Sequence, residues 1–216
     1  MGAEINPVSQ FPLTFSVAHA ATVTRSSTNK DFTIRSLADM IAKQPPLAEE
    51  ILNDLIAKHG VKQGTLEAKK LTPILYFGQY PDGARVRTKE NIEAATAIVF
   101  DFDQRAGDNV TRTEFLAACK AHNLQVLLHD SFSAGDDGKT FRAIFPCAPL
   151  ATDCYQAAAL GLKHLLGMAP GSILPVSQGF FYTSRPGRSP NVQALFGKPV
   201  DPVLAFAMLE AITADL

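Results

Sequence analysis

Short apolar runs alternate with helix-length runs in the second half of the chain, and this alternation constrains the fold more than any other feature. The run Ala97-Ile98-Val99-Phe100 is typical of a buried strand. A Thr at position 111 precedes apolar residues at helical spacing, as at a capped helix start. Strands are predicted at residues 97–100, 125–129, 141–146 and 179–183. Helices are predicted at residues 111–122 and 152–168.

The resulting order is β-α-β-β-α-β, the RRM-like or ferredoxin-like arrangement of an α+β fold. In its usual strand order, 4-1-3-2, both helices lie on one face, and the other face is expected to be open and to carry the site. Three segments should then meet at one edge of the sheet. They are residues 101–104, 131–139 and 176–179.

The pattern of the first ninety residues predicts a mostly helical flank, which we expect to pack on this core. Apolar residues recur at three- and four-residue steps in two runs, residues 34–41 and 51–56, with Pro45-Pro46 between them. Residues 71–77 could form a strand, and a last helix is expected at residues 203–212. We therefore expect an N-terminal flank at 1–90 and a core at 91–216, together forming one compact domain.

Composition excludes several classes of protein. The chain has 216 residues, 46% of them hydrophobic and 19% charged, which is enough for a real core. The chain has 20 Lys plus Arg and 21 Asp plus Glu, so it has no net positive charge that would attract nucleic acid or anionic lipid to the whole molecule. No apolar run or leader pattern indicates a membrane or export. The three cysteines suit neither a disulfide framework nor a zinc knuckle, so a cytoplasmic location is expected.

Two carboxylates are the strongest candidates for chemistry. Asp101 and Asp103 end an apolar strand two residues apart, so their side chains leave on the same face. Such a pair can share one hard cation, Mg²⁺ or Mn²⁺. The alternative is that the pair only ends the strand and begins a polar loop.

The predicted hairpin after residue 130 suits a phosphate tail, because it supplies hydroxyls, backbone donors and a cation. Its candidate phosphate ligands are Ser131, Ser133 and Lys139, and an ordinary Gly/Asp loop is the alternative. Arg142 interrupts an apolar strand and needs a partner, either a structural carboxylate or a ligand phosphate. His129 ends a strand beside this loop and could be a base, a phosphate ligand or a structural histidine.

Positive charge gathers in residues 139–200, where six Lys and Arg face a single Asp. Arg185, Arg188 and Lys198 are the candidates for contact with a nucleic-acid backbone. The alternative is that they pair with acidic residues of the flank. The aromatic residues nearby, Phe180 and Tyr182, suit the core better than base stacking.

Five segments in this order resemble the archaeo-eukaryotic primase superfamily, in its phage and plasmid primase-polymerase branch. They read Arg-Thr-Lys-Glu-Asn at 87–91, Ile-Val-Phe-Asp-Phe-Asp at 98–103, Leu-Leu-His-Asp-Ser-Phe-Ser at 127–133, Phe-Arg-Ala-Ile-Phe-Pro at 141–146 and Ser-Gln-Gly-Phe-Phe-Tyr at 177–182. The resemblance implies a phage or plasmid replication protein that synthesises a primer on a DNA template from nucleoside triphosphates. It further implies metal binding by Asp101 and Asp103, and a replicative helicase as a possible partner.

Two positions depart from the family pattern. Ala134 stands where members usually have a histidine, and no acidic residue occurs at 171–175, shortly before the last predicted strand. Whether the chain is an enzyme is therefore left open. The alternative is a catalytically degenerate module for DNA binding or replication assembly. A phosphatase of the haloacid dehalogenase type also has Asp-x-Asp after a strand, but here Gln104-Arg105 follow the pair where a Thr is expected.

Overall fold

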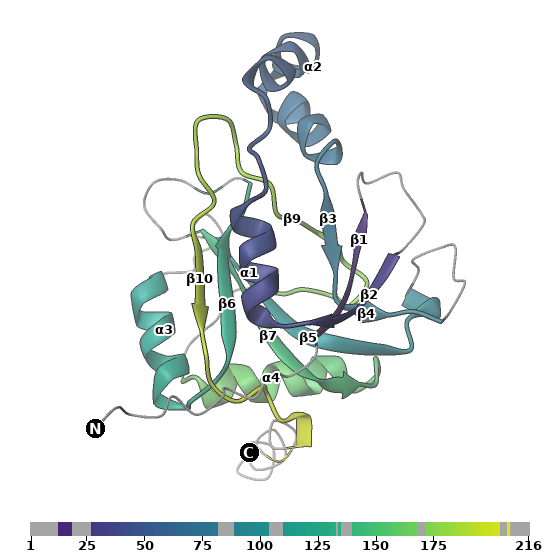
Figure 1. Cartoon of the computed structure of the whole chain (residues 1–216), viewed down its shortest axis with the longest axis vertical. Helices are drawn as coiled ribbons and strands as arrows, with labels where there is room; N and C mark the ends of the chain where they lie inside the picture. Colours follow the sequence, from purple (N-terminus) through teal and green to yellow (C-terminus); the bar gives the residue numbers. More distant parts are fainter. Residues whose placement is uncertain are drawn as a thin grey trace.

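The computed structural model describes residues 13–18, 27–81, 89–103, 110–132, 134, 140–167, 172–203 and 207. Within these residues the chain is an α+β protein with a six-stranded sheet, a four-stranded sheet and the helices α1 to α4 (Figure 1). No helix in the described ranges is long and apolar enough to cross a membrane.

The larger sheet has the strand order β10-β6-β7-β5-β4, in which β4 pairs with the first residues of β5 and β8 pairs with residues near its end. Every strand pair in it is antiparallel. Its strands are β4 (Gly78–Gln79), β5 (Ala94–Phe102), β6 (Val126–Asp130), β7 (Phe141–Leu150), β8 (Ser172–Ile173) and β10 (Val192–Leu195). The first three predicted strands are therefore confirmed as β5, β6 and β7.

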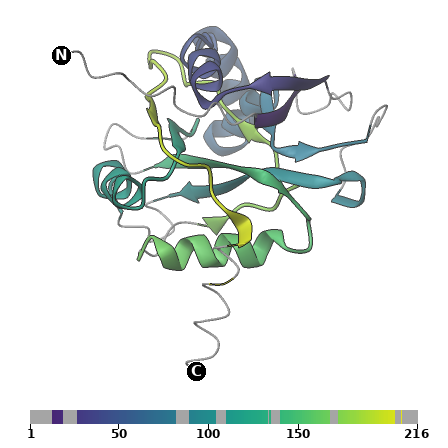
Figure 2. The same ribbon diagram turned by 60° about the horizontal axis from the view of Figure 1, so that its bottom comes forward.

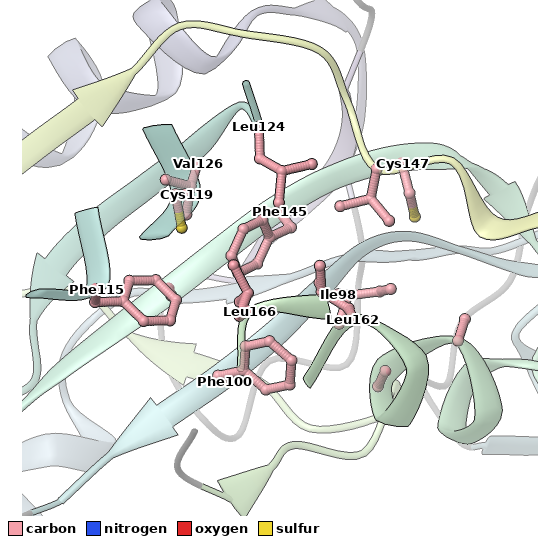
Figure 3. Close-up of a cluster of buried hydrophobic side chains, with 14 of the residues drawn as sticks. Ile98, Phe100, Phe115, Cys119, Leu124, Val126, Phe145, Cys147, Leu162 and Leu166 are labelled. Carbon is pink, nitrogen blue, oxygen red and sulfur yellow. The ribbon is translucent and has the colours of Figure 1, made fainter. Parts of the chain in front are cut away.

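Both predicted core helices are present, as α3 (Arg112–Ala121) and α4 (Tyr155–Leu165). α3 begins where the sequence indicates, because the Thr111 hydroxyl accepts from the Glu114 amide and the Glu114 carboxylate accepts from the Thr111 amide. The two helices pack on one face of the larger sheet. Figure 3 shows Phe115 of α3 and Leu162 of α4 in the same cluster as Phe100 and Phe145 of the sheet.

The phenylalanines of this cluster fix the end of β5. The Phe102 ring stacks on Phe141, with centroids 4.5 Å apart, and meets Phe115 edge-on at 4.8 Å. Phe102 is the last residue of β5, and alternation along the strand directs the carboxylate of Asp101 away from the phenylalanine core. The buried ring of Phe102 thus holds Asp101 on the opposite face, and Asp103 follows the end of the strand.

That opposite face is covered, so the predicted open face is wrong. Over it lie α1 (Ile34–Ala42) and the smaller antiparallel sheet, of order β2-β1-β3-β9 (Figure 2). The strands are β1 (Leu13–Ala18), β2 (Ser27–Phe32), β3 (Ile74–Tyr76) and β9 (Phe180–Phe181). The larger sheet has apolar residues on both of its faces, so both faces are buried. On the second face, Val99 and Ile144 join Leu37 of α1 and Leu75 of β3 in a second buried cluster.

The predicted fourth strand is also corrected. Within residues 179–183 only Phe180–Phe181 form a strand, and this strand pairs with β3 rather than with the larger sheet. The position beside the end of β5 that was predicted for this strand is instead held by β8, whose residues 172 and 173 pair with Asp101 and Phe100. The aromatic run belongs to the second cluster, where Phe180 lies against Phe77 with ring centroids 5.6 Å apart.

The N-terminal flank contains more than helices. The predicted helix at 34–41 is confirmed as α1, and α2 (Glu49–Lys70) follows the Pro45-Pro46 break and extends well beyond the predicted run at 51–56. Gly60 interrupts α2 with φ 77°, and a Cβ on Gly64 would lie 2.5 Å from the Leu55 carbonyl oxygen, so the two halves of α2 are in close contact. The flank also supplies β1 to β4. Of the C-terminal helix predicted at 203–212, all but residues 203 and 207 lie outside the described residues.

Gly179 is required where the chain crosses β3. A Cβ at this position would lie 2.3 Å from Ile74 Cγ2 and 2.5 Å from Tyr76 Cζ. We expect Gly179→Ala to lower the free energy of unfolding by about 1–3 kcal/mol through overpacking, measured by urea denaturation. Gln178→Ala, at the exposed neighbouring position, is the control and should change the midpoint little. Equal midpoints for the two variants would contradict the close approach.

Candidate functional site

Three adjacent strands of the larger sheet place polar side chains in one row at the edge where β5 ends. Asp101 of β5 is in register with Arg142 of β7, and Arg142 is in register with His129 of β6. Each lies two residues from a member of the second buried cluster, so all three side chains lie on the face that carries α1 and the smaller sheet. At the usual strand spacing, Asp101 and His129 are about 10 Å apart across the sheet.

The two predicted metal ligands are at the solvent end of this row. Asp101 and Asp103 are both partly exposed, whereas Phe102 between them is buried. Among the described residues, no group of three or more His, Cys, Asp and Glu side chains could hold a metal. Two carboxylates nevertheless fit the protein share of a magnesium site, in which substrate phosphates and water complete the shell.

Arg142 joins three strands. Its Nε donates to Asp101 Oδ1 at 2.9 Å, and its Nη1 donates to the Phe181 carbonyl of β9, also at 2.9 Å. The guanidinium carbon lies 5.7 Å from the centre of the Phe180 ring. The partner that the sequence required for this arginine is therefore Asp101, and a cation that binds Asp101 would have to share or displace Arg142.

His129 is buried at the middle of the sheet edge, with 1% of its surface exposed. Its Nδ1 lies 2.9 Å from the Asp130 carbonyl oxygen, and within the described part of the chain its Nε2 has no hydrogen-bond partner. Burial, and secondarily the positive charges of Arg142 and Arg112, lower the pKa of His129 to about 3. The imidazole is thus uncharged at neutral pH.

A further ion pair, which the sequence patterns did not indicate, joins Arg112 and Asp130 beside the row, with 8% of the Arg112 side chain and 23% of the Asp130 side chain exposed. The Arg112 guanidinium donates to the Asp130 carboxylate and, at 3.1 Å, to the Asn191 carbonyl. Arg112 is the first residue of α3, where the helix dipole disfavours a positive charge. That unfavourable position is the signal in the sequence that could have indicated a specific partner.

The segment after β6 brings Arg188 to the candidate site. Arg188 Nη1 donates to the Ala134 carbonyl, and the Ala134 amide donates to the Ser131 carbonyl at 2.9 Å. Lys69 of α2 lies over the ring of Phe132, with its Nζ 5.7 Å from the centroid. Ser131 is therefore close to positive charge. Ser133 and Lys139, the other predicted phosphate ligands of the loop, lie outside the described residues.

The three predicted nucleic-acid contacts do not lie together. Arg185 and Arg188 belong to one turn, closed by a hydrogen bond of 3.2 Å from the Arg188 amide to the Arg185 carbonyl. Lys198 instead pairs through its backbone with Asn123 and Gln125, just before β6 begins. The arginines and Lys198 are thus at opposite ends of β6.

Burial of neutral His129 predicts a pH dependence of stability. An unfolded chain binds a proton at His129 below its ordinary pKa of 6.5, while the folded protein resists protonation down to about 3. The contribution of His129 to the free energy of unfolding is therefore fully present above pH 6.5. It falls as the pH drops toward 3, by up to about 1.4 kcal/mol per pH unit. Urea denaturation at several pH values should show a flatter profile for His129→Gln than for the natural chain. Parallel profiles would contradict the burial of a neutral imidazole.

Comparison with known proteins gives one structural likeness. The sequence matches no protein family and no curated protein. The structure is similar to the AEP domain of the primase-polymerase of cyanophage S-2L, with a TM-score of 0.45 and 12% sequence identity over 91% of this chain and 88% of that one. AEP is the superfamily that the sequence motifs resemble.

Proposed function

We propose that this chain is a nucleotidyltransferase of the primase-polymerase type, which binds nucleoside triphosphates and a DNA template. The observation that carries the proposal is the row Asp101, Arg142 and His129 at the edge of the sheet, with Asp103 after it and Arg188 beside it. Carboxylates and arginines side by side suit a cation and the phosphates that it neutralises. Three of the five sequence motifs that resemble primases fall on these same strands, β5, β6 and β7.

Each side chain of the row has a distinct task in this proposal. Asp101 and Asp103 would hold Mg²⁺ or Mn²⁺, which neutralises phosphate charge and lowers the pKa of the attacking hydroxyl. Arg142 would turn from Asp101 toward a phosphate oxygen. Ser131, Ser133 and Lys139 would donate to the remaining phosphate oxygens from the loop.

We also propose that residues 91–216 contain the RRM-like unit, with β5, α3, β6, β7, α4 and β8 as its six elements. The proposal is supported by the pairing of β7 with both β5 and β6, and of β8 with the free side of β5. Residues 1–90 would then be the flank that covers the site-bearing face.

The direct test of activity is synthesis on a DNA template with Mg²⁺ or Mn²⁺. Primer extension and de novo priming, each with ribonucleotides and with deoxyribonucleotides, should yield products with the natural chain and none with Asp101→Asn. Product that persists in the variant would place the reaction elsewhere or in a contaminant. No product from the natural chain under any of these conditions would overturn the enzymatic proposal.

The second candidate function is a non-catalytic module for DNA binding or replication assembly. It is favoured by the ion pair of Asp101 with Arg142 and by the lack, in the described ranges, of a third acidic ligand. Under this reading Arg142 is a permanent structural partner of Asp101. DNA binding without nucleotide binding or synthesis would then be the result.

Contact of Arg188 with a nucleic-acid backbone predicts a specific change in salt dependence. Each neutralised phosphate releases counterions, so Arg188→Ala should flatten the dependence of log affinity on log salt by about one unit. Fluorescence anisotropy with single-stranded DNA at several salt concentrations measures this slope. Lys163→Ala is the control, because Lys163 lies on α4, which packs on the other face of the larger sheet. Equal slopes for the two variants, or no binding at low salt, would contradict the contact.

A further inference from the structure

His129 offers a hydrogen-bond acceptor that the described part of the chain leaves unused. A carbonyl oxygen can only accept, so the contact of Nδ1 with the Asp130 carbonyl places the ring hydrogen on Nδ1. Nε2 then carries a lone pair. It is buried, and no described residue is its hydrogen-bond partner. A buried polar atom in this state calls for a partner such as a ligand or an ordered water.

The surroundings of His129 keep the imidazole in this state. The ion pair of Arg112 with Asp130 holds the last residue of β6, whose carbonyl receives the Nδ1 hydrogen. Arg142, the neighbour of His129 in the row, opposes a positive imidazole. The pKa of about 3 means that the ring stays neutral across the physiological range. His129 is therefore a fixed acceptor rather than a switch between donor and acceptor.

This state decides which part of a nucleotide His129 can contact. The oxygens of an ionised triphosphate have lone pairs and no hydrogen, so they cannot donate to Nε2. In ATP the donors are the sugar hydroxyls and the exocyclic amine of adenine. His129 is about two strand spacings, or about 10 Å, from Asp101 across the sheet, so a nucleotide with its phosphates at Asp101 and Arg142 is long enough to bring its sugar or base to His129.

We infer that His129 determines substrate specificity by accepting a hydrogen bond from the nucleoside part of the substrate, through a sugar hydroxyl or an exocyclic amine. The inference rests on the proposed function and gives His129 a ligand group other than the phosphate expected from the sequence. Without that donor the acceptor stays buried and unsatisfied. A substrate that lacks it should bind about 5-fold to 150-fold more weakly, since an unsatisfied buried polar group costs about 1–3 kcal/mol.

Isothermal titration with Mn²⁺ and a set of nucleotides tests this inference. The sugar arm compares ATP with 2′-deoxyATP and 3′-deoxyATP, and the base arm compares ATP with purine riboside triphosphate, which lacks the exocyclic amine. The natural chain should bind one of these analogues about 5-fold to 150-fold more weakly than ATP. The arm in which the loss occurs identifies the donor.

Variants of His129 separate specificity from general damage to the site. His129→Phe fills the space without an acceptor and should bind ATP and the sensitive analogue equally well. His129→Gln supplies an amide oxygen and should keep part of the preference, provided that thermal melting shows a folded protein. His122→Ala, at an exposed histidine after α3, is the control and should keep the full preference.

The possible outcomes are distinguishable. Equal affinity of the natural chain for all four nucleotides would overturn this inference and leave the proposed function intact, with a water molecule on Nε2. No binding of any nucleotide would overturn both. A second measurement does not depend on the variants. Nitrogen-15 spectra of the natural chain should show an unprotonated Nε2 that shifts on addition of ATP, and a protonated Nε2 would overturn the inference.

Discussion

Replacement of Asp101 by asparagine is expected to weaken Mn²⁺-dependent binding of a nucleoside triphosphate by about 100-fold or more. Groups that only orient a metal ligand are worth about 10-fold to 100-fold in metal affinity, and Asp101 is proposed as a direct ligand. Asparagine keeps the size of the side chain and removes its charge. Isothermal titration of nucleotide in the presence and absence of Mn²⁺ measures the effect.

Two controls make the result specific. Asp153→Asn removes an exposed carboxylate just before α4 and should leave nucleotide affinity unchanged. Arg142→Gln removes the competitor of the cation at Asp101, so it should strengthen Mn²⁺ binding to the nucleotide-free protein. An Asp101→Asn variant that binds nucleotide as well as the natural chain does would show that the carboxylates only end the strand.

Loss of Asp130 is expected to produce a large destabilisation in this part of the molecule. Asp130→Ala leaves the Arg112 guanidinium buried without its carboxylate, and such a change costs about 3–5 kcal/mol. Burial already lowers the pKa of Arg112, and the charge of Asp130 opposes that shift. Urea denaturation should therefore show a clear fall in the unfolding midpoint.

The double variant identifies the cause. Arg112→Met together with Asp130→Ala removes both charges and should recover much of the lost stability, because no unpaired buried charge remains. Asp54→Ala breaks the exposed pair of Asp54 with Lys58 on α2 and should have little effect. If the double variant is as unstable as the sum of its single variants, the pair does not contribute as a unit.

Local patterns in the sequence were sufficient for the elements of the core. The apolar run at 97–100 and the Thr111 cap specify β5 and α3 through contacts within a few residues, and both are present as predicted. The pairing of Phe180 and Phe181 with β3 depends on partners a hundred residues away, which periodicity does not report. The cover over the second face was missed for the same reason, since apolar residues on α1 do not say which sheet they meet.

The candidate site was predicted in its residues more than in its contacts. The charge of Arg142 in an apolar strand indicated that this residue needs a partner, and it has one. The common face of Asp101 and Asp103 stays a prediction, because Asp103 lies after the end of β5. The choice of Asp101 as that partner follows from strand register, which the sequence left open. The tautomer of His129 is set by the contact of Nδ1 with the carbonyl of Asp130, the next residue. The sequence does not show that contact, so only a structure could assign the tautomer.

The most direct test of the account is to locate the cation. Crystals grown with Mn²⁺ and a non-hydrolysable nucleoside triphosphate, with data collected near the manganese absorption edge, would show where the metal binds. The account predicts an anomalous peak between the carboxylates of Asp101 and Asp103, with a phosphate oxygen in its coordination shell and Arg142 turned toward the phosphates. An Asp101 that stays paired with Arg142, with nucleotide bound and no manganese at these carboxylates, would contradict it.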